Sequence, residues 1–191
     1  MGIAVSLGEV VASVREGRVG LPVAHWVVDA VKAHGRFEPV LVDLREIGLP
    51  MLEEPAHPRL QQYTDDRTKV WSAKIASLDA FVFVTPEYNH AAPPALINAL
   101  DHLYNECNYK AAAFVSYGGV SGGLRSVQMA KPLLSALKMV PIVEAVTLPS
   151  VHKLVEAGRF TPEPAHQKAA AVMLDELGRW TDALAVLRTP R

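Results

Sequence analysis

The stretch AFVFVTPEYNH, which runs over Ala80–His90, decides the fold. Residues 80–85 are almost all apolar, aromatic or β-branched, which is typical of a strand buried on both faces of a parallel sheet. A polar turn that begins at Pro86 follows directly, and prolines at 93–94 suit the first turn of a helix. We therefore expect a buried strand that ends in a loop, and in open α/β sheets ligands bind at loops beyond the carboxyl ends of the strands.

Apolar runs alternate with helix-like segments along the rest of the chain, which is the pattern of βαβ units around a parallel sheet. Strands are expected near Glu9–Ala12, where Gly8 and Glu9 interrupt the pattern, and at 39–43, 80–85, 111–116 and 141–146. Helices are expected at about 22–34, 68–76, 93–107, 122–139 and 166–187. The segment 46–58 is rich in proline and polar residues, which predicts a loop.

Five strands with helices between them predict a flavodoxin-like α/β fold. This is a three-layer, doubly wound sandwich around a five-stranded parallel sheet in the order 2-1-3-4-5, and its ligand binds at the switch point between strands 1 and 3. The chain has 191 residues with no repeat and no interdomain linker, so we expect one domain over 1–191. Ser121 is expected to cap the helix at 122–139, and Pro132 to bend it.

The composition excludes several classes of function. The net charge of −1 gives no electrostatic reason to expect a nucleic-acid or membrane-surface partner. No apolar run reaches the roughly 18 residues of a membrane span, and the first residues lack the pattern of a signal peptide, so a cytoplasmic location is expected. Cys107 is the only cysteine, which excludes an internal disulfide.

The loop after the first strand has the composition of an anion-binding turn. It leads to a helix N-terminus, where free N–H groups and the helix dipole favour negative charge. Ser13 adds a hydroxyl, and Arg15 and Arg18 add guanidinium groups that match phosphate oxygens. Gly17 and Gly20 permit close approach of the backbone. The loop therefore predicts binding of a terminal phosphomonoester, and a solvated surface turn with two arginines is the alternative.

The turn that begins at Pro86 predicts one side of a ring-binding site. Pro86 fixes one backbone angle, so the short turn holds its N–H groups still. We expect backbone groups of Glu87, Tyr88 and Asn89 to meet the polar edge of a flat heterocycle such as the isoalloxazine of a flavin. The alternative is an ordinary strand-to-helix turn in which proline and asparagine serve only the turn.

The glycine-rich run from Ser116 to Gly123 predicts the other side of the ring site. Its glycines let the backbone lie flat against a planar ligand without a side-chain clash. Tyr117 is expected to stack on the ring or cap it, and Ser116 and Ser121 to donate hydrogen bonds. A flexible turn followed by a helix cap is the alternative, since a glycine motif on its own is a weak signal.

No motif for independent side-chain chemistry accompanies these loops. The sequence has no Cys/His cluster with zinc spacing and no Gly-x-Ser-x-Gly nucleophile turn. The chemistry must then come from a bound cofactor, to which the protein supplies position and electrostatics. We therefore expect no catalytic side chain and no metal ligand.

The chain resembles the NADPH-dependent FMN reductase family, a flavodoxin-like group that includes quinone, azo and chromate reductases. The resemblance covers roughly 9–185 and rests on the Ser13 loop, on Pro-Glu-Tyr-Asn at 86–89 and on Tyr-Gly-Gly at 117–119 with Ser-Gly-Gly at 121–123. It implies FMN as cofactor and NADPH or NADH as co-substrate. Hydride would pass through flavin N5 to a small-molecule quinone, azo or similar acceptor in a ping-pong cycle, and the protein would be a homodimer or homotetramer.

The resemblance also implies three groups of cofactor-binding residues. The phosphate would be held by Ser13, Arg15, Gly17, Arg18 and Val19, the isoalloxazine bordered by Pro86, Glu87, Tyr88 and Asn89, and its pyrimidine side lined by Tyr117, Gly118 and Gly119.

Two other functions remain open on the sequence. A flavodoxin-like carrier, which passes single electrons to protein partners, would have the same fold, although such carriers usually dock through strong charge. A weakly flavin-binding, non-catalytic relative is suggested by Ala12, which stands where the family usually has glycine, and by the irregular residues 1–9.

Overall fold

The computed structural model describes residues 5–188. Its sheet contains β1 (Val5–Val11), β2 (Phe37–Asp43), β3 (Ala80–Pro86), β4 (Ala111–Tyr117) and β5 (Val140–Leu148). The α-helices are α1 (Gly20–His34), α2 (Leu44–Ile47), α3 (Asp66–Ala76), α4 (Pro94–Asp101), α5 (Leu124–Ala136) and α6 (Pro164–Arg188). Short 3₁₀ turns lie at Pro58–Leu60, Asn105–Cys107 and Val151–Lys153, and β6 (Val155–Glu156) pairs with β7 (Arg159–Phe160) in a small hairpin.

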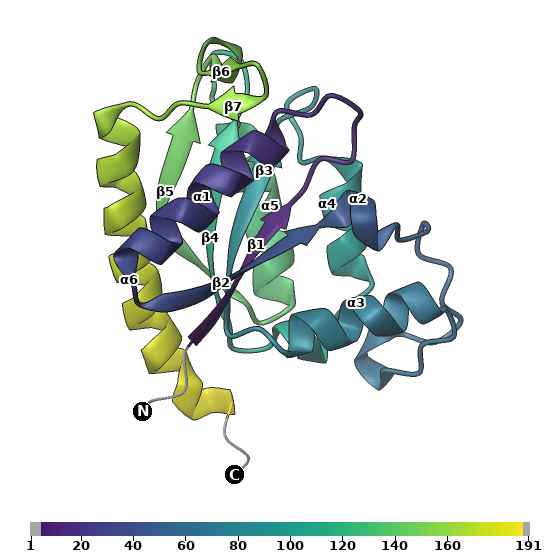
Figure 1. Ribbon diagram of the computed structural model, residues 1–191. Helices are drawn as coiled ribbons and strands as arrows, with labels where there is room; N and C mark the ends of the chain where they lie inside the picture. The colour runs from purple at the N-terminus through teal and green to yellow at the C-terminus, as the bar shows by residue number, and fades with distance from the viewer. Residues whose placement is uncertain (1–4, 189–191) are drawn as a thin grey trace.

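The strand order is β2-β1-β3-β4-β5, with every neighbouring pair parallel (Figure 1), which confirms the flavodoxin-like prediction. The register aligns Val11 of β1 with Val84 of β3, and Pro86 of β3 with Tyr117 of β4. Because these strands run in the same direction and end level with one another, the loops that follow β1, β3 and β4 leave the sheet at one edge.

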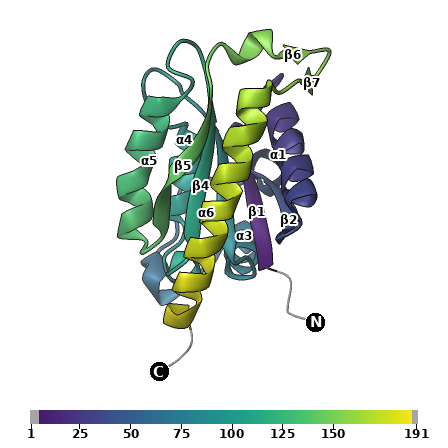
Figure 2. The same ribbon diagram turned by 90° about the vertical axis from the view of Figure 1, so that its left-hand side faces the viewer.

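Helices cover both faces of the sheet, as the edge-on view of Figure 2 shows. One core cluster lies under α1 and α6 and includes Val27 and Leu177, and the other lies under α3, α4 and α5 and includes Trp71. Successive side chains of β3 point alternately into the two clusters: Val82 packs in the first and Phe83 in the second. No helix within 5–188 is long and apolar enough to cross a membrane.

The first strand is longer than the sequence indicates. It begins at Val5 and is buried from Leu7 onward, whereas the expected strand began near Glu9. The strand continues through Gly8. A Cβ at this position would lie only 2.8 Å from Leu78 Cδ1 and 3.1 Å from Phe81 Cδ1. A glycine is therefore required where β1 packs tightly against its neighbours, and it weakens the sequence pattern without weakening the strand.

Two further expectations need correction. The helix expected at 93–107 ends at Asp101, because the Tyr104 N–H leaves the helical pattern and donates to the Glu106 carboxylate at 3.1 Å. The loop expected at 46–58 overlaps the end of the short helix α2. Asp43 caps that helix by accepting the Arg45 N–H at 2.9 Å.

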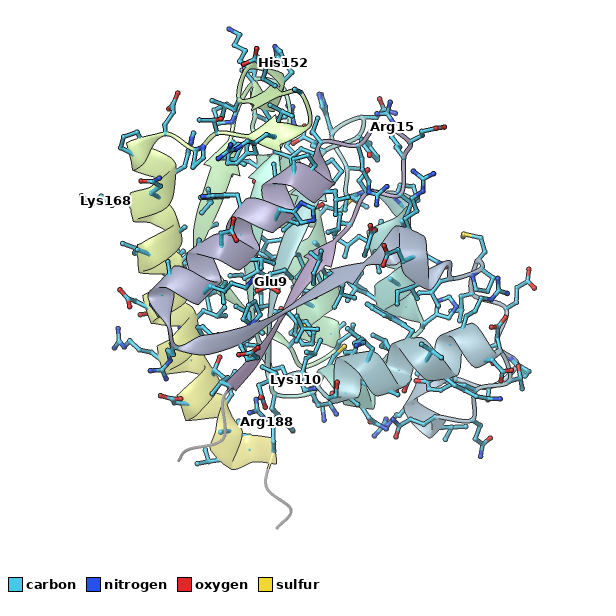
Figure 3. The ribbon with its side chains drawn as sticks, viewed as in Figure 1. Glu9, Arg15, Lys110, His152, Lys168 and Arg188 are labelled. Carbon is cyan, nitrogen blue, oxygen red and sulfur yellow. The ribbon has the colours of Figure 1, made fainter. Side chains whose placement is uncertain are left out.

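Glu9 is a carboxylic acid in the middle of the sheet, on the face that α1 covers (Figure 3). It is 0% exposed, and neither carboxyl oxygen has a hydrogen-bond partner among the described residues. Burial raises the pKa of Glu9 from 4.5 to about 8. The folded protein therefore holds a proton near neutral pH that the unfolded chain releases. Folding stability must fall as the pH rises between these two values.

We predict that Glu9→Gln removes this pH dependence. Between pH 5 and pH 8 the free energy of unfolding of the wild type should fall, relative to the variant, by roughly 1.4 kcal/mol per pH unit, because one proton is released on unfolding. Urea unfolding at four pH values in this range measures the difference. Glu38→Gln, an exposed change on the neighbouring strand, serves as control. Parallel stability curves for the wild type and Glu9→Gln would contradict the prediction.

Candidate functional site

The loop after β1 and the turn after β3 meet at the carboxyl edge of the sheet. The Ser13 Oγ and the Tyr88 hydroxyl oxygen lie 2.6 Å apart. The guanidinium carbon of Arg15, which is labelled at this edge in Figure 3, lies 5.6 Å from the centre of the Tyr88 ring, within cation–π range. The arginine-bearing loop and the tyrosine-asparagine turn thus form one continuous surface at the topological switch point.

The N-terminus of α1 opens onto this surface. Val19 is the N-cap residue, no side chain among residues 5–188 caps the helix, and its first turn contains no acidic residue. Gly17 has a φ of 65°, and a Cβ built there would meet nothing within 4 Å, so the space beside the loop is open. Together with the Ser13 hydroxyl and the exposed Arg15, the helix N-terminus fits an anion of phosphate size.

Arg18, which was expected to bind the phosphate, has a different partner. Its guanidinium forms an ion pair with Asp43 at the end of β2, and the two side chains are only 10% and 4% exposed. A carboxylate buried to this extent requires a partner, because leaving its charge unpaired is costly. Arg18 therefore fixes the Ser13 loop to the neighbouring strand, and Arg15 is the exposed guanidinium of the loop.

The turn after Pro86 is a tight two-residue turn. Tyr88 and Ala91 exchange backbone hydrogen bonds of 3.1 and 3.0 Å, and the residues between them, Asn89 and His90, have φ values of 51° and 67°. Two central residues with positive φ define the primed turn of β-hairpins, and asparagine adopts this region more readily than most residues. The N–H groups of Asn89 and His90 take no part in the turn's own bonds, and both residues are exposed.

Glu87 ties this turn to the glycine-rich loop. One carboxylate oxygen accepts from the Ser121 hydroxyl at 2.9 Å and from the Arg125 N–H at 3.0 Å. The other accepts from Arg125 Nε at 2.6 Å. The Glu87 side chain is 6% exposed, and although burial opposes ionisation, these hydrogen bonds hold its pKa below the ordinary value.

The backbone of the glycine-rich loop is set by close contacts. Gly122 and Gly123 have φ values of 59° and 89°, and a Cβ at Gly123 would lie 2.8 Å from the Tyr117 nitrogen. The Gly119 carbonyl accepts the Ser150 N–H at 2.8 Å, which anchors the loop to the end of β5. A Cβ at Gly119 would meet nothing within 4 Å, so the outer side of this loop is open for the edge of a ring.

The side chains of Ser116, Tyr117 and Ser121 turn away from that opening. Ser116 is fully buried, and Ser121 bonds to Glu87 while Gly123 takes the N-cap position of α5. Tyr117 was expected to stack on the ring or cap it. It is instead 4% exposed, with its hydroxyl 2.3 Å from where a Cβ on Gly20 would lie. The alternation of β4 directs the Tyr117 side chain toward α1, so its ring lies in the core.

Ala12 packs on the opposite side of the sheet from α1. It is fully buried in the core cluster under α3, α4 and α5, and its N–H donates to the Val84 carbonyl at 3.0 Å. The Ala12 methyl group is thus directed into this core. The Ala12 side chain therefore does not point toward α1, whose N-terminus follows the Ser13 loop.

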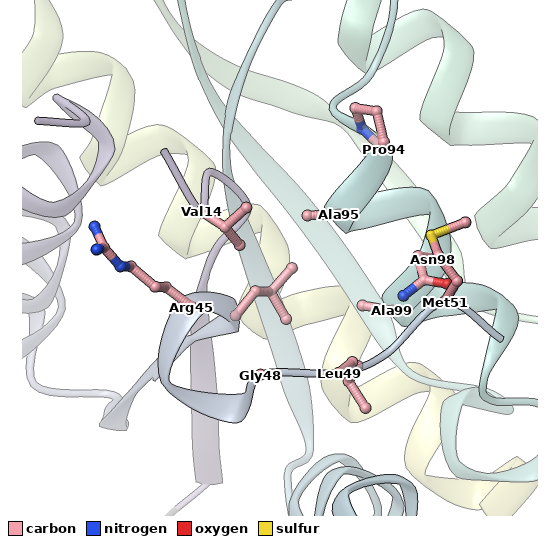
Figure 4. A pocket seen from close by; sticks show the side chains of 10 residues that line it. Val14, Arg45, Gly48, Leu49, Met51, Pro94, Ala95, Asn98 and Ala99 are labelled. Atoms are coloured by element: carbon pink, nitrogen blue, oxygen red, sulfur yellow. The ribbon is translucent and has the colours of Figure 1, made fainter. Parts of the chain in front are cut away.

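An apolar groove lies beside the Ser13 loop, between α2 and α4 (Figure 4). It has a volume of about 380 Å³ and is lined by Val14, Leu44, Arg45, Gly48, Leu49, Met51, Pro94, Ala95, Asn98 and Ala99. The Asn98 side chain forms one wall. Its Nδ2 donates to the Pro50 carbonyl at 2.7 Å and its Oδ1 accepts the Leu52 N–H at 3.0 Å, which holds the loop after α2 along α4.

The sequence analysis missed Asp43 as a residue that holds the site together, and it missed the pairing of Arg125 with Glu87. Asp43 ends an apolar strand at the carboxyl edge of the sheet, and that position is a signal that could have identified it. Arg125 lies 38 residues from its partner Glu87, and no local pattern connects the two. No group of three or more His, Cys, Asp or Glu side chains in the described part of the chain could hold a metal ion.

The fold and the three loops define a flavodoxin-like protein whose sheet edge fits a phosphorylated planar ligand. The chain belongs to the NADPH-dependent FMN reductase family, because the model of that family matches residues 6–153. It is thus an oxidoreductase with FMN as cofactor and NAD(P)H as co-substrate.

Individual relatives agree with this assignment. An NAD(P)H-dependent FMN reductase of Schizosaccharomyces pombe is 44% identical over 144 residues, which is 73% of this chain and 72% of the relative. An NAD(P)H-dependent FMN reductase of Nectria sp. is 36% identical over 148 residues, or 73% of each chain. The solved structure of FerB, a flavoenzyme NAD(P)H:(acceptor) oxidoreductase from Paracoccus denitrificans, has the same fold, with a TM-score of 0.75 at 23% identity over 94% of this chain and 98% of that one.

We predict that Glu87→Gln loosens the tie between the turn after Pro86 and the glycine-rich loop. The loss of a charged, hydrogen-bonded partner should lower the free energy of unfolding by about 1–3 kcal/mol near pH 7. The lowered pKa of Glu87 means that this contribution exists above the ordinary carboxyl pKa and disappears as the pH falls through the folded-state value. The difference from wild type should therefore shrink near pH 3.

Thermal or urea unfolding at pH 7 and pH 3 measures this difference. Glu156→Gln, an exposed change in the small hairpin, is the matched control and should be neutral at both pH values. An equal loss of stability at pH 7 and pH 3 would show that the charge of Glu87 is not what holds the loops together.

Proposed function

We propose that the protein transfers hydride from NAD(P)H to a quinone, azo or similar small-molecule acceptor in ping-pong order, with FMN carrying the hydride between the two. The observation that carries this proposal is the convergence of an anion-binding loop and a rigid ring-facing turn, joined by the 2.6 Å contact between Ser13 and Tyr88. The family match supports the same cofactor independently.

The residues of the site divide into those that bind FMN and those that hold the binding groups in place. Ser13, Arg15 and the backbone of 17–19 bind the phosphate, while Arg18 fixes that loop to β2 through Asp43. The turn from Pro86 to Asn89 borders the ring, and the backbone at Gly118 and Gly119 lines its pyrimidine side.

No side chain of the site needs to act as an acid or base for hydride transfer. Ion pairs and hydrogen bonds hold the loops before any ligand arrives, so catalysis consists of orientation. Preorganised backbone dipoles add to it by favouring charge that develops on the ring.

The apolar groove beside Val14 supports an aromatic acceptor. Its lining is largely aliphatic, which suits a flat apolar ring system, and Asn98 and Arg45 are its main polar side chains. We place part of the acceptor in this groove, with its reacting end toward the ring site. We also propose a homodimer or homotetramer, which is supported by the family resemblance alone. A cytoplasmic location is supported by the sequence pattern alone.

We predict that anaerobic mixing of the FMN-loaded protein with NADPH in a stopped-flow instrument bleaches the flavin absorbance band. Steady-state rates measured against both NADPH and a quinone should then give parallel double-reciprocal lines, because the two substrates bind in turn. A flavin band that stays unbleached would exclude the reductase. A long-lived one-electron species during redox titration would instead favour an electron carrier.

We predict that Ala95→Phe raises the KM for a naphthoquinone roughly tenfold, since the phenyl group would fill the groove. The rate of flavin bleaching by NADPH should be unchanged, because the ring site is untouched. Ala136→Phe, an exposed change at the far end of α5, is the control. If Ala95→Phe leaves the naphthoquinone KM at the wild-type value, the acceptor does not occupy the groove.

A further inference from the structure

The hydroxyl of Tyr117 is a buried polar group with no partner. Tyr117 is 4% exposed, and its hydroxyl oxygen makes no hydrogen bond within residues 5–188. Its ring packs in the apolar cluster under α1 and α6. An unpaired hydroxyl in such surroundings is unfavourable, and native proteins rarely retain one without a use. The group therefore calls for a functional explanation.

The position of this hydroxyl is specific. It lies against Gly20, the first residue of α1, so closely that a Cβ on Gly20 would be 2.3 Å away. Burial raises the Tyr117 pKa well above the ordinary tyrosine value, and the neighbouring Ser13 hydroxyl opposes this only in part. The phenol thus keeps its proton at all physiological pH values and is a hydrogen-bond donor.

Three hydroxyl groups from three separate segments therefore gather beneath the anion-binding space. Ser13 comes from the loop after β1, Tyr88 from the turn after β3, and Tyr117 from the end of β4. Ser13 is between the other two, paired with Tyr88 at 2.6 Å and beside Tyr117. Ser13 belongs to the loop that leads through Gly17 to the uncapped N-terminus of α1.

We infer that Tyr117 is a positioning residue that makes the site selective for the phosphorylated flavin. Its hydroxyl donates a hydrogen bond to Ser13 Oγ when the Ser13 hydroxyl donates a hydrogen bond to the phosphate. The inference rests on the proposed function in one respect, the assignment of the Ser13 loop to the FMN phosphate. It differs from the expectation that Tyr117 contacts the ring.

The number of protons on Ser13 and on the phosphate determines which groups must donate hydrogen bonds. A serine hydroxyl has one proton to donate and two lone pairs that accept, and a phosphate dianion only accepts. Ser13 must therefore turn its single proton to the phosphate, and its lone pairs then need donors. The Tyr88 and Tyr117 hydroxyls supply both of them. The Tyr117 hydroxyl has no geometric hydrogen-bond partner in the described residues, so a bond that it forms to Ser13 when the phosphate is bound would contribute to FMN binding and not to folding.

The test is Tyr117→Phe, which removes the hydroxyl and keeps the ring. The dissociation constants of FMN and of riboflavin, which lacks the phosphate, are measured by flavin fluorescence quenching. We expect the FMN constant to rise about tenfold and the riboflavin constant to stay at the wild-type value. The unfolding midpoint of the flavin-free protein should be unchanged or higher, whereas loss of a merely structural group would lower it.

Two further variants complete the experiment. In a Ser13→Ala background, Tyr117→Phe should have no additional effect on the FMN constant, because Tyr117 acts through Ser13. Tyr109→Phe removes a hydroxyl at the opposite edge of the sheet and should alter neither constant. Equal weakening of FMN and riboflavin by Tyr117→Phe, or no weakening of either, would overturn the inference while leaving FMN binding itself established. A wild-type protein that binds neither flavin would overturn the proposed function and this inference together.

Discussion

The parallel alignment of β1, β3 and β4 is the constraint on which the rest of the structure depends. It places Val11 beside Val84 and Pro86 beside Tyr117, so that three loops distant in sequence leave the sheet at one edge. A slip of one residue would turn every side chain of a strand to the opposite face. Tyr117 would then leave the N-terminus of α1, and the Ala12 methyl would turn toward it. Because helices cover both faces of the sheet, such a slip would force both core clusters to repack.

Polar contacts fix the conformations of the loops at this edge, as apolar packing fixes the core. The Ser13–Tyr88 pair, the Glu87 carboxylate with Ser121 and Arg125, and the Arg18–Asp43 ion pair each join two loops or a loop and a strand. Loops lie at the surface and bury little apolar area, so specific hydrogen bonds must define their shape. Holding the loops before a ligand binds reduces the ordering cost of binding and leaves the exposed N–H groups in fixed positions.

Most of the fold could be predicted because its signals are local. The run at 80–85 is apolar throughout since β3 is buried on both faces, and the alternation of strands and helices indicates the strand order through the known topology. The prediction was least accurate where tertiary contacts override local pattern. Gly8 weakened the pattern of β1, yet it is needed where Phe81 and Leu78 pack, and α4 ends early because Glu106 accepts the Tyr104 N–H.

The sequence by itself determined which fold forms, which loops follow its strands and which backbone features those loops carry. These depend on residue spacing, on glycine and proline positions and on apolar runs, all of which act over a few residues. Only the tertiary structure decided which side chains face a ligand and which face one another. Arg18 is paired with Asp43, Tyr117 points into the core, and Ser13 meets Tyr88 across 75 residues of chain. Such pairings follow from strand order, register and the face to which each side chain points, and no short segment of sequence contains that information.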